Sequence, residues 1–197
     1  LLKNYFLEII IISSTILLIL HELYMLEKST NAAVFYLIIP ILIILLLKKK
    51  PSNFGICIGD YKRWIKYYLI AMIFMAPLLY YASTSANFIN YYSSQVGNLK
   101  INPFSFIFYT AVYMFSWEFI FRGFLLFGLT NIFKEGSILI QTIPFAILHL
   151  GKPALEAISS IFGGIYLGYI CYKSRSLIPA FLIHFSIKII LIFMMLI

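Results

Sequence analysis

Residues 116–123 read Ser-Trp-Glu-Phe-Ile-Phe-Arg-Gly and place two opposite charges inside an otherwise apolar segment. The surrounding run, residues 104–129, contains no charge besides Glu118 and Arg122 and is long enough to cross a bilayer. At helical spacing the two side chains lie one turn apart on the same face. Because charges inside a membrane are costly, they usually face the protein interior. The pair is therefore either a structural ion pair or part of a functional site.

The composition extends this interpretation to the whole chain. Of the 197 residues, 62% are hydrophobic and only 11% are charged. A soluble domain of this length could not cover so much apolar surface with so few charges. We therefore predict an all-α fold, a polytopic transmembrane helix bundle of about seven spans, since each span needs about 20 residues.

The excess of basic over acidic residues indicates lipid as a partner and not nucleic acid. The formal charge is +8, but the lysines and arginines sit at the ends of apolar runs, where they orient helices and meet anionic lipid. No basic face is interleaved with aromatic residues for base stacking, which excludes a nucleic-acid partner. Cys57 and Cys171 lack metal or redox spacing and are expected to be free thiols.

The apolar runs predict the order of the spans. They cover residues 5–20, 32–47, 64–82, 103–131, 138–150, 154–171 and 177–197. The chain is thereby divided into three generic N-terminal spans (1–82), a polar loop (83–103) and a core of four spans (104–197). Pro103 is well placed as the first residue of the fourth helix. On span six, Ser160, Gly164 and Gly168 have the small-residue spacing of closely packed helices.

Lysine and arginine also predict the orientation. With a cytoplasmic N-terminus, ten basic residues fall on the inside: Lys3, Lys48, Lys49, Lys50, Lys62, Arg63, Lys66, Lys134, Lys173 and Arg175. Only Lys28, Lys100 and Lys152 fall outside, as the positive-inside rule requires. We predict an integral membrane protein with a cytoplasmic N-terminus. A short chain rich in lysine and isoleucine suggests a bacterial cell membrane.

Three late helices each carry polar residues at one-turn spacing. The fourth carries Glu118 and Arg122, the fifth ends in Phe-Ala-Ile-Leu-His149, and the seventh contains His184 and Lys188. In hydrocarbon every polar group needs a partner, so convergence on one buried site is expected. Such a cavity is suited to general acid and base chemistry on a water molecule.

Other readings of these polar residues stay open. His149 lies near the end of its span and could simply bond a loop carbonyl at the interface. Lys188 lies so deep that it needs a partner, for which Glu118 is a candidate. His21 falls in the predicted link between the first two spans and is expected to be solvated. No role is assigned to four glutamates near span ends: Glu8, Glu22, Glu27 and Glu156.

These residues resemble the motifs of the CPBP family, the intramembrane proteases named for CAAX prenyl endopeptidases and bacteriocin-processing (Abi-type) proteins. The family pattern is Glu-Glu-x-x-x-Arg, then Phe-x-x-x-His, then His-x-x-x-Asn, on successive late helices. Here the first motif has Trp117 in place of its first glutamate, and the third has Lys188 in place of asparagine. The second motif, from Phe145 to His149, matches in full. The resemblance covers about residues 104–190.

The resemblance implies a glutamate and a histidine that activate water against a peptide bond. Carried over, His149 would help Glu118 to activate water, His184 would hold the oxyanion, and Arg122 would orient Glu118. The family usually uses its first glutamate as the base, and Trp117 cannot accept a proton. Lys188 would either donate to the oxyanion or pair with Glu118 and silence it.

The predicted spans leave a mismatch in depth. His149 falls near the outer surface, whereas Glu118 lies roughly 22 Å along its helix from Pro103. The two can meet only if the fourth helix begins well outside the membrane or is steeply tilted, or if span five lies deeper than drawn.

Four functions are consistent with these residues. The first is an endopeptidase that cleaves a peptide or membrane-protein segment near the bilayer. The second is a catalytically silent homologue that acts in bacteriocin immunity or as a regulatory binding protein. No cofactor is expected, but Glu118, His149 and His184 also form the two-histidine, one-carboxylate set of zinc enzymes, which gives a third. An ion-coupled transporter is the fourth, and the lack of internal repeats argues against it.

Overall fold

The computed structural model describes residues 5–24 and 27–197, and every regular element within them is helical. The long helices are α1 (Phe6–Leu23), α4 (Tyr61–Thr84), α5 (Ala86–Ile101), α6 (Pro103–Glu118), α8 (Gly136–Ile147), α9 (Ala154–Ser174) and α10 (Ile178–Met194). Two helices contain a π-helical segment. In one, α2 (Lys28–Ala32) passes through Ala33–Ile38 into α3 (Ile39–Leu46), and in the other, α6 passes through Phe119–Leu125 into α7 (Leu126–Phe133). A 3₁₀ turn, Pro51–Phe54, completes the set, and the predicted all-α fold is confirmed.

The apolar helices indicate an integral membrane protein. Among the described residues, five helices are long and apolar enough to cross a membrane: Phe6–Leu23, Lys28–Leu46, Tyr61–Thr84, Pro103–Phe133 and Ala154–Ser174. Gly136–Ile147 and Ile178–Met194 are apolar but shorter. Together these helices correspond to the seven predicted spans.

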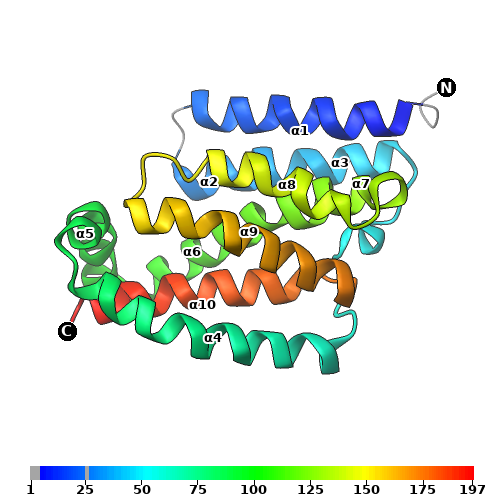
Figure 1. Ribbon diagram of the computed structural model, residues 1–197. Helices are drawn as coiled ribbons and strands as arrows, with labels where there is room; N and C mark the ends of the chain where they lie inside the picture. The colour runs from blue at the N-terminus through cyan, green and yellow to red at the C-terminus, as the bar shows by residue number, and fades with distance from the viewer. Residues whose placement is uncertain (1–4, 25–26) are drawn as a thin grey trace.

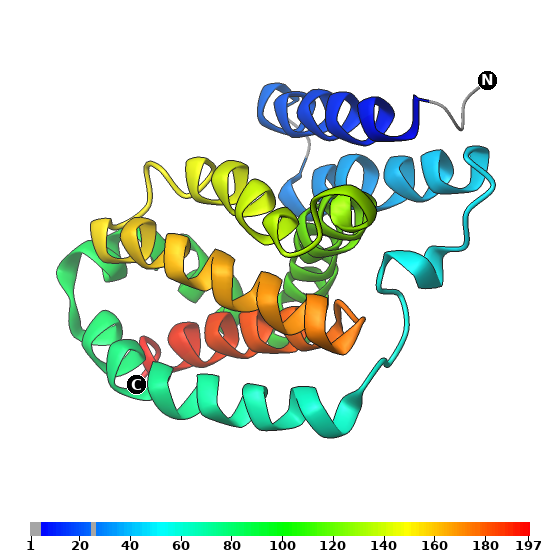
Figure 2. The ribbon, with the colours of Figure 1, turned by 45° about the vertical axis from the view of Figure 1, so that its right-hand side comes forward.

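The helices form a bundle with α1 on one side and α4 on the other (Figure 1). α4 packs along α10, and α8 packs along α9. Figures 1 and 2 both place α5 at one end of the bundle, near the C-terminal end of α10. α6 and the π-helical segment that continues it, Phe119–Leu125, pass through the middle of the bundle.

The segment predicted as a polar loop is the helix α5, and that prediction was wrong. Its serines, asparagines and glycine are weak helix formers, but Phe88, Tyr92 and Leu99 share one face and are buried. They pack in a cluster with side chains of α4, α6 and α10. Tertiary burial therefore overrides the weak propensity. The predicted start of the next helix is confirmed, since α6 begins at Pro103 and the Asn102 side chain accepts from the Ser105 amide at 3.0 Å.

The link predicted over residues 21–31 is also shorter than expected. α1 continues to Leu23, and the following helix begins at Lys28. Glu27 caps this helix, because its carboxylate accepts hydrogen bonds from the Ser29 hydroxyl and from the Thr30 amide. His21 therefore lies in the last turn of α1 and is buried, so the prediction that it is solvated was wrong.

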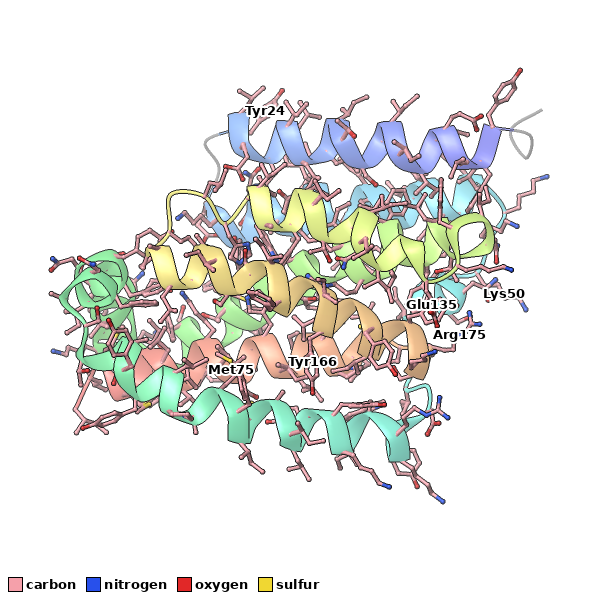
Figure 3. All side chains as sticks on the ribbon, in the orientation of Figure 1. Tyr24, Lys50, Met75, Glu135, Tyr166 and Arg175 are labelled. Carbon is pink, nitrogen blue, oxygen red and sulfur yellow. The ribbon has the colours of Figure 1, made fainter. Side chains whose placement is uncertain are left out.

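Basic side chains gather at one end of the bundle. Figure 3 shows Lys50, Glu135 and Arg175 at this end and Tyr24 at the other. Here Lys173 pairs with Glu135 at 2.8 Å. The gathering agrees with the charge pattern of the sequence, and the predicted cytoplasmic location of this end stays a prediction.

Small residues bring α8 and α9 close together. A Cβ added at Gly168 would lie 2.6 Å from the amide nitrogen of Gln141, and one at Gly164 would lie 2.8 Å from the Thr142 methyl group. The Gln141 amide in turn donates to the Gly164 carbonyl at 3.0 Å. The predicted close helix packing on this face is confirmed.

We expect Gly164→Val to weaken this contact by about 1–3 kcal/mol, because the added side chain overpacks against α8. The neighbouring Gly163 is a matched control, since a Cβ there meets no atom within 4 Å. The free energy of unfolding in detergent micelles, measured by denaturant titration, should fall for Gly164→Val and change little for Gly163→Val. Equal losses in the two variants would contradict the close contact.

Candidate active site

Glu118 and Arg122 form an ion pair with both side chains fully buried. Arg122 Nη1 lies 3.1 Å from Glu118 Oε2. The other carboxylate oxygen, Oε1, lies 2.6 Å from Nδ1 of His184 on α10. Because a carboxylate only accepts, Nδ1 of His184 carries the proton in this hydrogen bond. Oε1 thus accepts from the imidazole and, at 3.4 Å, from Arg122 Nη1, whereas Oε2 lies at ion-pair distance from the guanidinium but accepts no hydrogen bond.

The chain around this pair is not a regular α-helix. Glu118 is the last residue of α6, and the following seven residues, Phe119–Leu125, are π-helical. A π-helical turn inserts extra residues into the helix and changes the direction in which side chains point, and such turns are frequent at functional sites. All seven residues of the turn are buried. No sequence pattern predicts this turn, because a π-helical turn differs from an α-turn only in backbone pairing.

The Phe145 ring joins the ion pair to His149. The Arg122 guanidinium carbon lies 3.9 Å from the ring centroid of Phe145, a cation–π contact. On its other side the Phe145 ring is 4.4 Å from the His149 ring, centroid to centroid. Phe145, chosen from the sequence as a supporting residue, therefore separates Arg122 from His149.

His149 lies in the turn after α8 and is buried. Its Nδ1 lies 2.8 Å from the carbonyl oxygen of Phe145, so Nδ1 donates the proton and Nε2 is left as an acceptor. The ring is nearly parallel to that of His184, with centroids 6.4 Å apart. One interpretation of the sequence was that His149 bonds a loop carbonyl at the interface. It does bond a carbonyl, but that of Phe145, inside the bundle and beside His184.

The mismatch in depth has a structural explanation. α8 has only 12 residues and is therefore about 18 Å long, so it ends part-way through the bundle. α6 begins beside α5, at the end of the bundle where α8 does not reach (Figure 1). A short span five and a fourth helix that starts farther out bring His149 to the depth of Glu118.

Trp117 points away from Glu118 and is packed among aromatic rings. Adjacent helical positions differ by about 100° in direction, so neighbours in sequence face different elements. The Trp117 ring meets Tyr36 at 5.7 Å and His149 at 5.8 Å between centroids, both edge to face. Its side chain is 4% exposed. Trp117 therefore fills the space beside His149.

Lys188 does not reach Glu118, so the suggested pairing was wrong. Its ammonium lies 3.7 Å from the ring centroid of Tyr92 on α5. The Tyr92 hydroxyl donates to Glu156 at 2.6 Å, and Lys152 pairs with Glu156 at 2.9 Å. Lys188 is one turn farther along α10 than His184, where α5 replaces α6 as its neighbour. Glu156, to which no role was assigned, thus links α5 with α9.

Burial, and next the Glu156 carboxylate, raise the pKa of the Tyr92 phenol. The phenol therefore stays protonated and remains the donor of this hydrogen bond. The contacts join α10, α5 and α9, and Lys152 belongs to the loop that leads from His149 into α9.

His21 is a site neighbour that the sequence reasoning missed. Its ring stacks on Tyr36 at 4.2 Å and meets Trp117 at 6.4 Å, edge to face. A signal was present, because Ile10, Ser14, Leu17 and His21 are spaced as one face of a helix, and all four are buried.

Glu118, His149 and His184 are not grouped as the ligands of a zinc ion would be. Among the residues that the structure describes, no three His, Cys, Asp or Glu side chains are grouped to hold a metal ion. A cation on Glu118 would also meet the Arg122 guanidinium at the same carboxylate. We therefore derive no step through a metal.

We expect Arg122→Met to destabilise the fold by about 3–5 kcal/mol, because it leaves the Glu118 carboxylate buried without its partner. Adding Glu118→Gln should recover much of this loss, since the double variant has no uncompensated charge. Arg63→Met is a matched control: Arg63 pairs with Asp60 at 3.3 Å, but both are about half exposed. Unfolding in detergent micelles measures all three, and no recovery in the double variant would contradict a buried charge pair.

The comparisons with known proteins agree with this geometry. Residues 99–190 match the family model described as type II CAAX prenyl endopeptidase Rce1-like. No curated protein and no solved structure matches the chain. The matched segment contains Glu118, Arg122, His149 and His184, which the three motifs supply. The match over residues 99–190 supports the assignment of this segment to the CPBP family of CAAX prenyl endopeptidase-like membrane proteins.

Proposed function

We propose that this protein is an intramembrane endopeptidase that hydrolyses a peptide bond at the cluster of Glu118, Arg122, His149 and His184. The observation that carries the proposal is the contact of these side chains, from the α6 helix, the turn after α8 and α10, in one buried cluster. Membership of an endopeptidase family supports the same reaction. The substrate is a peptide or a membrane-protein segment near the bilayer.

The hydrogen bonds suggest a role for each histidine. His149 has its proton on Nδ1, so Nε2 is free to accept a proton from water as the water oxygen attacks the peptide carbonyl. His184 donates through Nδ1 to the Glu118 carboxylate, and the proposed step requires a second proton on its Nε2. Its Nε2–H then donates to the oxyanion of the tetrahedral intermediate. His149 returns its proton to the leaving amine as the C–N bond breaks.

Glu118 acts in this proposal through His184 and not as the base itself. Its Oε1 accepts from His184 and its Oε2 lies against the Arg122 guanidinium, which differs from the role that the family resemblance implied. With Arg122 and a protonated His184, the trio carries one net positive charge. The negative oxyanion compensates this charge in the transition state, which is where stabilisation accelerates the reaction.

A catalytically silent homologue is the second candidate, and the packing of Trp117 favours it. Trp117 stands where the family has its first glutamate and lies against the His149 ring. A protein of this kind would hold a peptide or a membrane protein without cutting it. The suggested silencing contact between Lys188 and Glu118 is not formed, which removes the other argument for this function.

We expect the wild-type protein in liposomes to cleave members of a library of apolar peptides, and Glu118→Gln to lower the rate about 100-fold or more. His149→Gln should give a loss of the same order, because the base is removed. Mass spectrometry of the products in ¹⁸O-water should show one ¹⁸O in the new carboxylate.

Glu135→Gln is the matched control, since Glu135 is exposed and pairs with Lys173 at the other end of α8. Its rate should equal that of the wild type. Undiminished cleavage by Glu118→Gln would refute the proposed site. Peptide binding without any cleavage by the wild type would favour the silent homologue.

A further inference from the structure

Three polar aromatic side chains lie in mutual contact beside the candidate active site. His21 and Tyr36 stack at 4.2 Å between centroids, and both meet Trp117 edge to face, at 6.4 and 5.7 Å. Their exposed fractions are 8%, 0% and 4%. We call His21, Tyr36 and Trp117 the aromatic triad. It adjoins the catalytic cluster because Trp117 also contacts His149.

Each member of the triad carries a buried polar atom without a hydrogen-bond partner. These atoms are His21 Nε2, the Tyr36 hydroxyl and Trp117 Nε1. His21 donates through Nδ1 to the Glu22 carboxylate at 3.0 Å, so Nε2 is an acceptor. The indole of Trp117 only donates, and the hydroxyl of Tyr36 also donates. The triad thus offers two donors and one acceptor to a group that the protein does not supply.

A peptide group has the complementary pattern, with a carbonyl that accepts and an N–H that donates. Within a bilayer, backbone groups are normally satisfied inside a helix. A segment must unwind to present its peptide bond for hydrolysis, and its N–H and C=O groups then need new partners. Unpaired groups on the protein and on an unwound segment satisfy one another, which lowers the free energy of the complex.

An open groove is lined by sequence neighbours of the triad and of the catalytic cluster. It lies between α1 and α8, has a volume of about 380 Å³, and is lined mainly by apolar side chains. Glu22, which follows His21, and Leu148, which precedes His149, both line it. α1 stands at the outer side of the bundle in Figures 1 and 2. The groove gives an apolar peptide a surface one residue away in sequence from His21 and from His149.

We propose that the aromatic triad is a subsite that binds the backbone N–H and C=O groups of one extended residue of an unwound apolar substrate, next to the bond that is cut. Trp117 and Tyr36 donate to its carbonyl, and His21 accepts from its N–H. This inference rests on the proposed endopeptidase function. It gives Trp117 a role: although Trp117 cannot act as a base, it positions the substrate beside His149.

The test uses a synthetic 20-residue leucine/alanine peptide with lysines at both ends and a fluorophore, bound to the protein in liposomes. Single N-methyl groups, which remove one N–H each, are placed at successive positions. The protein carries Glu118→Gln so that no peptide is consumed. We expect N-methylation at one position to weaken binding about 5- to 10-fold, and at distant positions to have little effect.

The decisive comparison repeats this scan with His21→Phe, which keeps the stacked ring but lacks the acceptor. At the sensitive position, N-methylation should then cost nothing further, because the two changes remove the same hydrogen bond. Tyr36→Phe should weaken binding of the unmodified peptide, whereas Tyr24→Phe, a matched change at an exposed tyrosine at the end of α1, should not. Thermal unfolding of each variant identifies losses caused by misfolding.

The outcomes separate this inference from the proposed function. If N-methylation weakens binding equally in the presence and absence of His21, or if the peptide does not bind, the subsite is overturned and the triad holds water only. Cleavage that depends on Glu118 would still stand in that case. Coupling between His21 and one N–H without any cleavage by the wild type would support the subsite and overturn the endopeptidase.

Discussion

The buried ion pair between Glu118 and Arg122 is the constraint on which the middle of this protein depends. Two full charges in a low-dielectric interior are costly, and each must be met by groups that the surrounding helices supply. His184 of α10 meets the second oxygen of the carboxylate, and Phe145 of α8 covers the guanidinium. The pair thus fixes how α6, α8 and α10 approach one another, and the same contacts bring the two histidines together.

Helix length and helix irregularity then set the depth of each group. α8 ends after 12 residues, so the turn that carries His149 lies inside the bundle. The π-helical turn follows Glu118 directly and directs a run of buried side chains into the core. The close contact of α8 with α9, made by Gly164 and Gly168, keeps the short helix in place. A longer α8 would carry His149 beyond the reach of His184.

Aromatic rings occupy most of the space around the charged groups. Trp117 packs against rings from α1, the segment Ala33–Ile38 and the turn after α8. The N-terminal helices, which the sequence describes only as generic spans, therefore contribute His21 and Tyr36 to the surroundings of the site. On α10, one turn beyond His184, the Lys188 ammonium lies over the Tyr92 ring of α5 and does not pair with Glu118. The site is thus built by the whole chain and not only by residues 104–197.

The sequence by itself determined the membrane class, the helical spans and the residue types of the site. Composition and the length of apolar runs suffice for the first two, because the bilayer imposes a thickness on every span. The motif spacing selected Glu118, Arg122, His149 and His184 as candidate site residues, because intramembrane polar residues are few and need partners. Only the tertiary structure decided which partners they find. That Lys188 contacts Tyr92, that residues 86–101 form a helix, and that His21 is buried all follow from contacts between segments distant in sequence. Such contacts depend on which faces the packed helices present to one another. The spacing of residues along one helix can indicate which face is buried, as for His21, but not which helix covers that face.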